Sequence, residues 1–366
     1  MLNLRSFRMN KLLIIVSVFI PELVWAGKAE PLKLSSLARS SLHEASNFNS
    51  KWNHDNWNKI RAFIESRSSL VNQVAVFDFD NTLIKNDIGD ATLIHMLVND
   101  QIESPPSWQS TSRHLTAGGL ASLNKHCPLD ANRSSLKVSS NPQCLTAILC
   151  VYKEGFTWDG VSKSGTLEER CVGKPAFTTK SPATQDTIKP SYAWNAALLA
   201  GNTPENVRNA AREAFKKYTK APIGQQIKIG YIEGLNAYIR VYEEMRDLVK
   251  ELKNNNFDVW ISTASSQYFV DPIAPEYFGI PAERVIGVRS VLKEGIITSS
   301  FLGCGSFEDG QDIINYRQGK KCWINKIIFQ RPKDQQLHTR NNTKRKMFID
   351  TIKAPIFLYN FCYKLI

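Results

Sequence analysis

An apolar run that ends in two acidic residues constrains this chain more than any other stretch. Val74 to Phe77 is followed by Asp78 and, two positions later, by Asp80. The length and β-branched content of the run predict a buried strand over residues 74–77. Because side chains alternate along a strand, both acids are expected to point the same way at its end. Packing does not account for such a pair, since neighbouring carboxylates repel unless a proton or a cation relieves them.

The position of this acidic pair predicts a catalytic site. Open α/β sheets bind ligands at the carboxyl ends of their strands, where Asp78 and Asp80 are expected to lie. One carboxylate would act as nucleophile, the other as proton donor and acceptor, and Mg²⁺ would neutralise both. The structural alternative is an acidic turn, with Asp80 or Asn81 capping the N-terminus of a helix.

The pattern Asp78-x-Asp80-x-Thr82 after an apolar strand resembles the first motif of the haloacid dehalogenase-like (HAD) superfamily. The resemblance implies that Asp78 forms an aspartyl-phosphate. It also implies that Asp80 protonates the leaving group and then activates water. An acid at the second position favours a phosphatase, because the dehalogenases of the superfamily lack it.

Two later stretches resemble the second and third HAD motifs. Residues 259–266 predict a strand that runs into a hydroxyl-rich turn, which suits a phosphoryl oxygen. The resemblance favours Thr263 as the phosphate ligand, with Ser262 as the alternative. The third motif is matched by Gly319 followed by Lys320. This lysine would offset the negative charge between the nucleophile and the phosphoryl group. Lys321 is the alternative residue for this role.

Most of residues 52–328 resemble the exported HAD phosphatases typified by phosphorylcholine phosphatase. This resemblance is carried by residues 56–64, by residues 86–90 after the first motif and by residues 108–115. Residues 278–287 also resemble the segment that follows the second motif in phosphoserine-phosphatase-like HAD proteins. Cap aromatics could hold a quaternary ammonium group by cation–π attraction, or could form a small core of their own. These aromatics are Trp108, Trp158, Tyr192 and Trp194.

The fourth HAD motif, an acidic loop that helps to hold Mg²⁺, is not found after Lys320. Met347 to Asp350 is a candidate short strand that ends on an acid, but residues 351–366 contain no Asp or Glu. We therefore expect Asp78, Asp80 and Asp350 as metal ligands, and a chain truncated or shifted in frame near Asp350. A Mg²⁺-dependent phosphomonoesterase, with activity reduced or lost, is the predicted function. The alternative is an inactive HAD-fold remnant that only binds ligand.

The predicted fold class is α/β: a Rossmann-like HAD core with a parallel sheet and a large, mainly helical cap inserted after the first catalytic strand. The expected divisions are a signal peptide at 1–26, core at 27–99, a Cys-rich cap at 100–230, core at 231–350 and an aberrant tail at 351–366. Hydrophobic periodicity predicts helices over residues 52–70, 88–98, 112–125, 204–218 and 232–255, and strands over residues 74–77, 257–262 and 285–288.

The N-terminus and the cysteines predict export. Residues 1–26 have a basic front, a short apolar run and small residues before a cleavage site near Ala26, which is typical of a secretory signal. The apolar run is too short for a membrane anchor, which takes about 20 residues. Six of the seven cysteines are expected to form three disulfides, and the four within residues 127–171 allow three pairings. We expect a periplasmic or secreted protein.

The net charge of +12 raises the question of a nucleic-acid partner. The basic residues are scattered along the chain, apart from short clusters at residues 320–321 and 344–346. We therefore expect a small phosphorylated substrate and neither a nucleic-acid partner nor a stable membrane anchor. The sequence leaves the oligomeric state open.

Overall fold

The computed structural model describes residues 52–70, 72–130, 135–178, 188–304 and 313–330. The predicted signal peptide at residues 1–26, the tail at 351–366 and the candidate metal ligand Asp350 lie outside the described residues. Within them, no helix has the length and apolar character needed to cross a bilayer.

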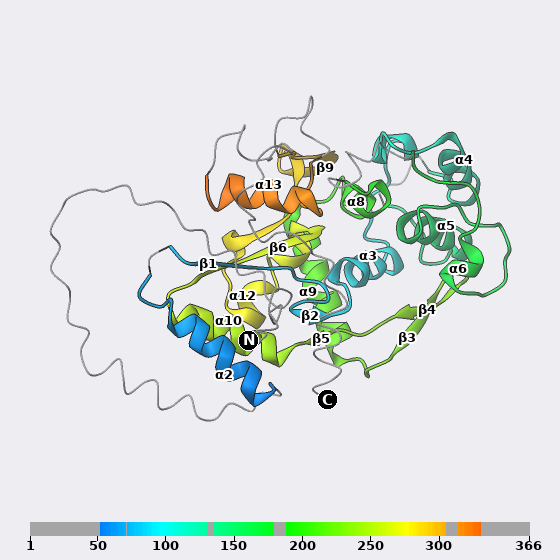
Figure 1. The fold of residues 1–366 in the computed structure, drawn as a ribbon. Coiled ribbons are helices and arrows are strands. Elements are labelled where there is room, and N and C mark those ends of the chain that lie inside the picture. The colour runs from blue at the N-terminus through cyan, green and yellow to red at the C-terminus, as the bar shows by residue number, and fades with distance from the viewer. Residues whose placement is uncertain (1–51, 71, 131–134, 179–187, 305–312, 331–366) are drawn as a thin grey trace, which may run out of the picture.

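A three-stranded parallel sheet forms the centre of the molecule (Figure 1). Its order is β1-β6-β7, so that β6 lies between the other two strands. Phe77 of β1 is in register with Ile261 of β6, which is in register with Val285 of β7. The predicted α/β fold with a parallel sheet is confirmed. The strands are β1 (Val74–Phe77), β6 (Asp258–Ser266) and β7 (Val285–Val288).

Helices cover both faces of this sheet (Figure 1). On one face, Val74 and Val76 of β1 pack with Ile324 of α13 (Gln318–Ile327). On the other, Ala75 and Phe77 join the main core beneath α2 (His54–Glu65), α10 (Glu243–Asn254) and α12 (Ala274–Phe278). Burial on both faces explains why the strand reads as a continuous apolar run.

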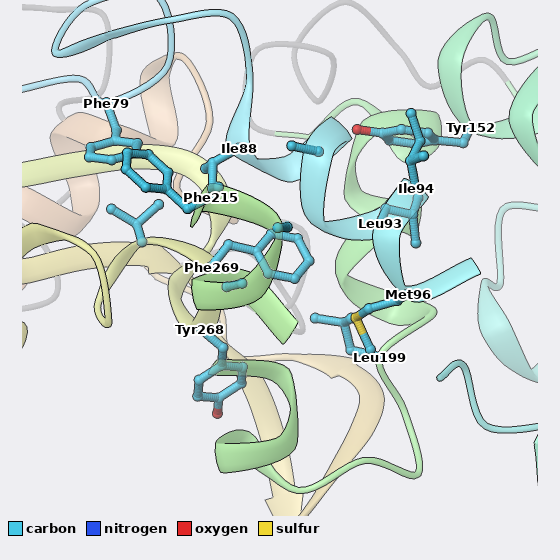
Figure 2. Close-up of a cluster of buried hydrophobic side chains, with 14 of the residues drawn as sticks. Phe79, Ile88, Leu93, Ile94, Met96, Tyr152, Leu199, Phe215, Tyr268 and Phe269 are labelled. Atoms are coloured by element: carbon cyan, nitrogen blue, oxygen red, sulfur yellow. The ribbon is translucent and has the colours of Figure 1, made fainter. Parts of the chain in front are cut away.

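Three further helices pack beside the sheet and carry much of the main core (Figure 2). They are α3 (Ile88–Val98), α9 (Pro204–Lys220) and α11 (Gln267–Val270). Phe79, which separates the two acids, is fully buried and meets Phe278 edge-on at 5.9 Å between ring centroids. The turn that carries both acids is therefore anchored in the core through the residue between them.

Short helices joined by long loops gather to one side of the sheet (Figure 1). They are η2 (Trp108–Thr111), α4 (Ala117–His126), α5 (Pro142–Lys153), α6 (Leu167–Arg170) and α8 (Pro190–Ala197). They lie in the region predicted as the cap. That residues 100–230 form a separate domain stays a prediction.

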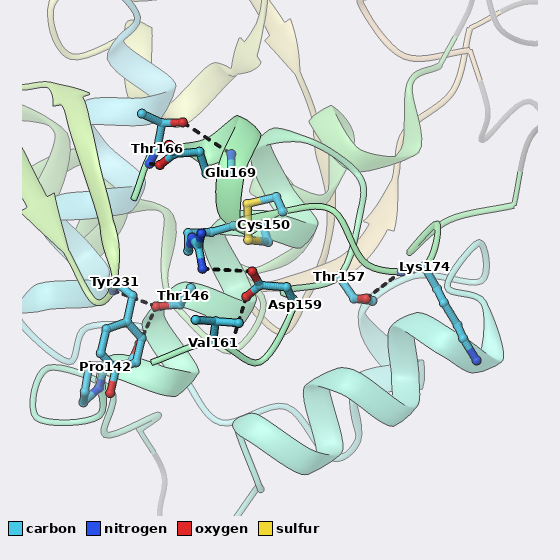
Figure 3. Close-up of a disulfide and its surroundings, with 12 residues drawn as sticks. Pro142, Thr146, Cys150, Thr157, Asp159, Val161, Thr166, Glu169, Lys174 and Tyr231 are labelled. Carbon is cyan, nitrogen blue, oxygen red and sulfur yellow. Dashed lines mark hydrogen bonds and ion pairs between the residues drawn. A yellow bond between two sulfur atoms is a disulfide. The ribbon is translucent and has the colours of Figure 1, made fainter. Parts of the chain in front are cut away.

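The described residues form three disulfides, the number expected from the sequence. The four clustered cysteines pair as Cys127–Cys144 and Cys150–Cys171, and the third disulfide is Cys304–Cys322. Beside Cys150–Cys171, Arg170 forms an ion pair with Asp159 at 3.0 Å (Figure 3). The two disulfides tie the end of α4 to α5 and α5 to the end of α6.

Short strand pairs complete the described fold. Two-stranded antiparallel pairs are formed by β2 (Ile84–Lys85) with β5 (Arg240–Val241), by β3 (Gln226–Ile229) with β4 (Ile232–Asn236), and by β8 (Ser290–Lys293) with β9 (Ile296–Phe301). The short helix η3 (Ala282–Arg284) precedes β7.

Several predicted elements match the structure closely. The strands at 74–77 and 285–288 and the helix at 88–98 have the predicted bounds. The helix at 204–218 continues to Lys220, whereas the helix predicted at 52–70 covers only His54–Glu65. The strand predicted at 257–262 runs on to Ser266.

The helix predicted over residues 232–255 is wrong in its first half. This half contains β4 (Ile232–Asn236) and β5 (Arg240–Val241), and the helix starts only at Glu243. Ile232 and Leu235 are buried while the residues between them are exposed, a spacing that imitates one helical turn. Gly230 and Gly234 have positive φ angles of 58° and 76°, which favour a turn and an irregular strand over a helix.

The helix predicted at 112–125 begins later than expected. The α-helix α4 starts at Ala117 because Thr116 caps it, accepting a hydrogen bond from the amide of Gly119. Residues 112–115 lie before this cap in non-helical backbone.

Candidate active site

Asp78 lies at the carboxyl end of β1, on the side of the sheet that α13 covers. Strand alternation places it on the same face as Val74 and Val76, which pack against that helix. Lys320, in the first turn of α13, brings its Nζ to 2.7 Å from the Asp78 carboxylate. The Asp78 side chain keeps 24% of its surface exposed, whereas that of Lys320 keeps 7%. The structure therefore pairs a buried lysine with a carboxylate that solvent can reach.

Asp80 is surrounded by hydrogen-bond donors. Its Oδ1 accepts a hydrogen bond from the Ile88 amide at 2.8 Å. Its Oδ2 accepts from the Ser265 hydroxyl at 2.7 Å and from the Thr263 hydroxyl at 3.3 Å. The donors come from the start of α3 and from the end of β6, so the carboxylate is fixed by two segments that are distant in sequence.

Burial raises the pKa of Asp80 from its ordinary value of 3.8 to about 6. The negative charges of Asp78 and Asp90 raise this pKa further, whereas the hydrogen bonds from Ile88 and Ser265 lower it. A carboxyl group with a pKa near 6 can hold a proton and release it close to neutral pH. The environment of Asp80 thus suits proton transfer.

Thr263 and Ser262, the two candidates for the phosphate-binding hydroxyl, differ in what they contact. Thr263 is fully buried and faces Asp80, and its Oγ1 also accepts the amide hydrogen of Ser265 at 3.1 Å. Ser262 instead donates to Asn315 at 3.1 Å. The side chain of Asn315 in turn donates to the carbonyls of Thr263 and Ile286. Thr263 is therefore the one that lies with the acidic pair.

Asn315 and Ser265 had no role in the sequence-based reading. Asn315 is fully buried and joins the ends of β6 and β7, and nothing in its sequence surroundings marks it out. Ser265 belongs to the hydroxyl-rich turn that the sequence singled out, but its contact with Asp80 depends on how β6 ends.

A second group of polar side chains lies beyond Asp80. Asp87 caps α3 by accepting the Asp90 amide hydrogen at 3.0 Å. Asp90 binds the Tyr152 hydroxyl at 2.7 Å and Lys153 Nζ at 2.5 Å, both from α5. Burial, followed by the charges of Asp80 and Asp90, raises the pKa of Asp87 well above its ordinary range. The acids after the first motif thus connect the turn that carries Asp78 and Asp80 to α5.

The four aromatic residues proposed to hold a cation do not form one cage. Trp108 and Trp194 are almost fully buried, and their indole nitrogens donate to Cys127 and Thr111. Trp158 is also buried and stacks on Tyr231. For these three tryptophans the structure supports the alternative, a core of their own. Tyr192 differs, because it is only partly buried and its ring lies 6.0 Å from that of Tyr316.

Comparison with known proteins identifies the protein family. The family of haloacid dehalogenase-like hydrolases matches residues 73–306, more than half of the chain. This chain therefore belongs to the haloacid dehalogenase-like hydrolases, as its acidic strand end suggested. A search among curated proteins finds no match.

Among solved structures, this fold is similar to a conserved protein of unknown function from Anaerococcus prevotii DSM 20548. The two are 23% identical, with 76% of this chain and 78% of that chain covered and a TM-score of 0.49. A phosphoserine phosphohydrolase-like protein from Francisella tularensis subsp. tularensis SCHU S4 is 16% identical, with coverages of 66% and 67% and a TM-score of 0.27. A phospho-aspartyl intermediate analogue of phosphoserine phosphatase is 14% identical, with coverages of 62% and 60% and a TM-score of 0.25.

The oxygen atoms at the site are of the type that binds a hard divalent ion. Asp78 and Asp80 offer the carboxylate and carbonyl oxygens that Mg²⁺ prefers. Within the described ranges, no group of three or more His, Cys, Asp or Glu side chains is arranged to hold a metal. Asp350, the third expected ligand, is outside those ranges.

Proposed function

We propose that this hydrolase cleaves phosphomonoesters through an aspartyl-phosphate on Asp78. The observation that carries the proposal is the contrast between the two neighbouring acids. Asp78 is accessible and paired with Lys320, whereas Asp80 is held by three donors and has a pKa of about 6. A nucleophile must be ionised and reachable, and a general acid must carry a proton near neutral pH.

In the proposed reaction, a carboxylate oxygen of Asp78 attacks phosphorus and the bond from phosphorus to the ester oxygen breaks. Asp80 gives its proton to the departing alkoxide, which leaves as an alcohol. The ionised Asp80 then takes a proton from water, which attacks phosphorus and releases phosphate and Asp78. Lys320 and Thr263 are proposed to bind phosphoryl oxygens, Lys320 by its charge and Thr263 by its hydroxyl.

Mg²⁺, when bound, would neutralise charge on the phosphoryl group and on the acidic pair. We propose Asp78, Asp80 and Asp350 as the residues that hold it. The substrate would be a small phosphorylated molecule.

Export of the protein is part of the proposal. The cysteine pairs Cys127–Cys144, Cys150–Cys171 and Cys304–Cys322 support an oxidising compartment. We propose that the protein acts in the periplasm or outside the cell after removal of its signal peptide near Ala26.

An assay of the purified protein with an alkyl phosphate tests the function. We expect turnover that requires Mg²⁺ and falls at least about 10³-fold in Asp78→Asn, with an unchanged circular dichroism spectrum. Binding of Mg²⁺ and inorganic phosphate in calorimetry, without any turnover by the unaltered protein, would contradict the proposal and indicate an inactive remnant that only binds ligand.

A further inference from the structure

The helix α13 carries Lys320, which is proposed to bind a phosphoryl oxygen, and Cys322 two positions later. Residues two positions apart do not share a side of a helix, whereas residues four positions apart do. Lys320 and Ile324 accordingly lie on one side of α13, where Ile324 packs against β1 and Lys320 reaches Asp78 at its end. Cys322 lies on a different side of the helix, where it forms a disulfide.

The first turn of α13 is held only weakly by the helix itself. Arg317, the residue before the helix, makes no capping hydrogen bond through its side chain. Its φ angle of 44° lies in the left-handed region, which a residue with a side chain disfavours. The amides of Gly319 and Lys320 bond to carbonyls only three positions back. These bonds shape the turn locally and do not tie it to the sheet, so its place depends on contacts with the rest of the fold.

The disulfide Cys304–Cys322, called the α13 disulfide below, fixes the second side of the helix. Both cysteines are buried, and Cys304 follows β9. They share an apolar cluster with Ile286 of β7 and with Trp323, whose indole nitrogen donates to the Ile313 carbonyl at 3.0 Å. Packing on β1 therefore holds one side of α13, and a covalent bond within this cluster holds another.

We propose that the Cys304–Cys322 disulfide is a positioning element that holds the first turn of α13, and with it Lys320, over the end of β1. The inference rests on the proposed function and adds that its phosphate-binding lysine depends on an oxidised cysteine pair. Without the bond, α13 keeps its contact with β1 through Ile324 but can turn about that contact. Such a turn moves Lys320 Nζ away from its place 2.7 Å from Asp78. A misplacement of about 1 Å can lower a reaction rate by up to about 100-fold.

A second disulfide provides a matched control. The cysteines of Cys127–Cys144 are 17 positions apart and those of the α13 disulfide are 18 apart. Loss of either bond should therefore destabilise the fold to a similar extent, because the stabilisation depends on the length of the loop that is closed. The control disulfide joins the end of α4 to α5 and does not involve α13. The two pairs separate a general loss of stability from a displacement of Lys320.

The experiment compares kcat for ethyl phosphate with Mg²⁺ among purified variants. Cys304→Ala/Cys322→Ala removes the α13 disulfide, and Cys304→Val/Cys322→Ala removes the bond while retaining more of the buried volume. Cys127→Ala/Cys144→Ala is the control. Each pair is also made together with Lys320→Met, so that a double-mutant cycle shows whether the disulfide acts through the lysine. All are assayed at a temperature at which they keep the circular dichroism spectrum of the unaltered protein.

We expect loss of the α13 disulfide to lower kcat about tenfold with either replacement at Cys304. Loss of the control disulfide should lower kcat less than about twofold, although both losses should lower the melting temperature similarly. In the Lys320→Met background, loss of the α13 disulfide should change kcat less than about twofold, because the displaced group is already absent.

Three results would overturn the inference alone. They are equal falls of kcat for the two disulfides, recovery of kcat with valine at position 304, and a further fall of about tenfold in the Lys320→Met background. Failure of the unaltered protein to hydrolyse ethyl phosphate with Mg²⁺ would overturn the proposed function and the inference together.

Discussion

The two sides of the candidate site are built in different ways. On the core side, Asp78 and Asp80 follow one strand and meet Lys320 and Thr263, which begin or end neighbouring elements. On the other side, α5 and α8 reach the acids through buried hydroxyl and amide groups such as that of Asn195. The core side holds the groups proposed to react, and the other side holds groups that contact the start of α3.

This difference shows which part of the site follows from local sequence patterns and which part depends on contacts between distant residues. The reacting groups are set by strand alternation and by the ends of parallel strands, which are local rules. The groups on the other side depend on contacts between residues more than 40 positions apart, such as Asn195 with Tyr152. The two sides can be tested separately.

The largest effect is expected on the core side, from Asp80→Asn. Loss of the general acid should lower kcat/KM for an alkyl phosphate about 10²- to 10⁴-fold.

Because the pKa of Asp80 is raised to about 6, its protonated form persists to a higher pH than usual. In the unaltered protein, kcat/KM for the alkyl ester should therefore decline above about pH 6, and this limb should vanish in Asp80→Asn. An identical decline in both proteins would contradict the assignment.

A somewhat smaller loss is expected from Lys320→Met. The variant removes the charge 2.7 Å from Asp78, so the phosphoryl group would lose its nearest cationic partner among the described residues. Steady-state assays should show kcat lowered about 10²- to 10³-fold. Lys321→Met is the matched control and should stay within about threefold of the unaltered protein. A larger loss in Lys321→Met would assign the role to the neighbouring lysine.

The smallest effect is expected beyond Asp80, where α5 meets α3. Lys153→Met removes an ion pair with Asp90 and should lower the free energy of unfolding by about 1.5 kcal/mol. Denaturant unfolding measures this change. Arg246→Met is the control, because its exposed pair with Glu243 should contribute less than about 0.5 kcal/mol. Equal effects of the two variants would show that the contact between α3 and α5 adds no more than an ordinary surface pair.

The sequence predicted the core side better than the other side. Strand alternation brought forward Asp78 and Asp80, and the resemblance to the HAD motifs brought forward Thr263 and Lys320. The structure places Lys320 against Asp78 and Thr263 against Asp80. Asn195 was not singled out, yet its buried amide donates to the Tyr152 hydroxyl on that other side. That contact depends on how α8 packs over Gly89, which no local pattern reveals.

The errors in secondary structure have a similar cause. Ile232 and Leu235 have helical spacing but lie in β4, because the chain turns at Gly230 and β4 pairs with β3. Pairing with a partner strand is decided by tertiary contacts, and it overrides a short periodic pattern. The role expected of Asp350 stays a prediction, since this residue is outside the described ranges.

Trapping the phosphorylated enzyme tests the central claim most directly. The protein would be mixed with excess alkyl phosphate and Mg²⁺, quenched in acid within the first turnovers, digested and analysed by mass spectrometry. We predict one phosphoryl group, located on Asp78, and none in Asp78→Asn treated in the same way. Turnover of the ester without any phosphoryl group on Asp78, or with a phosphoryl group on another residue, would contradict the account.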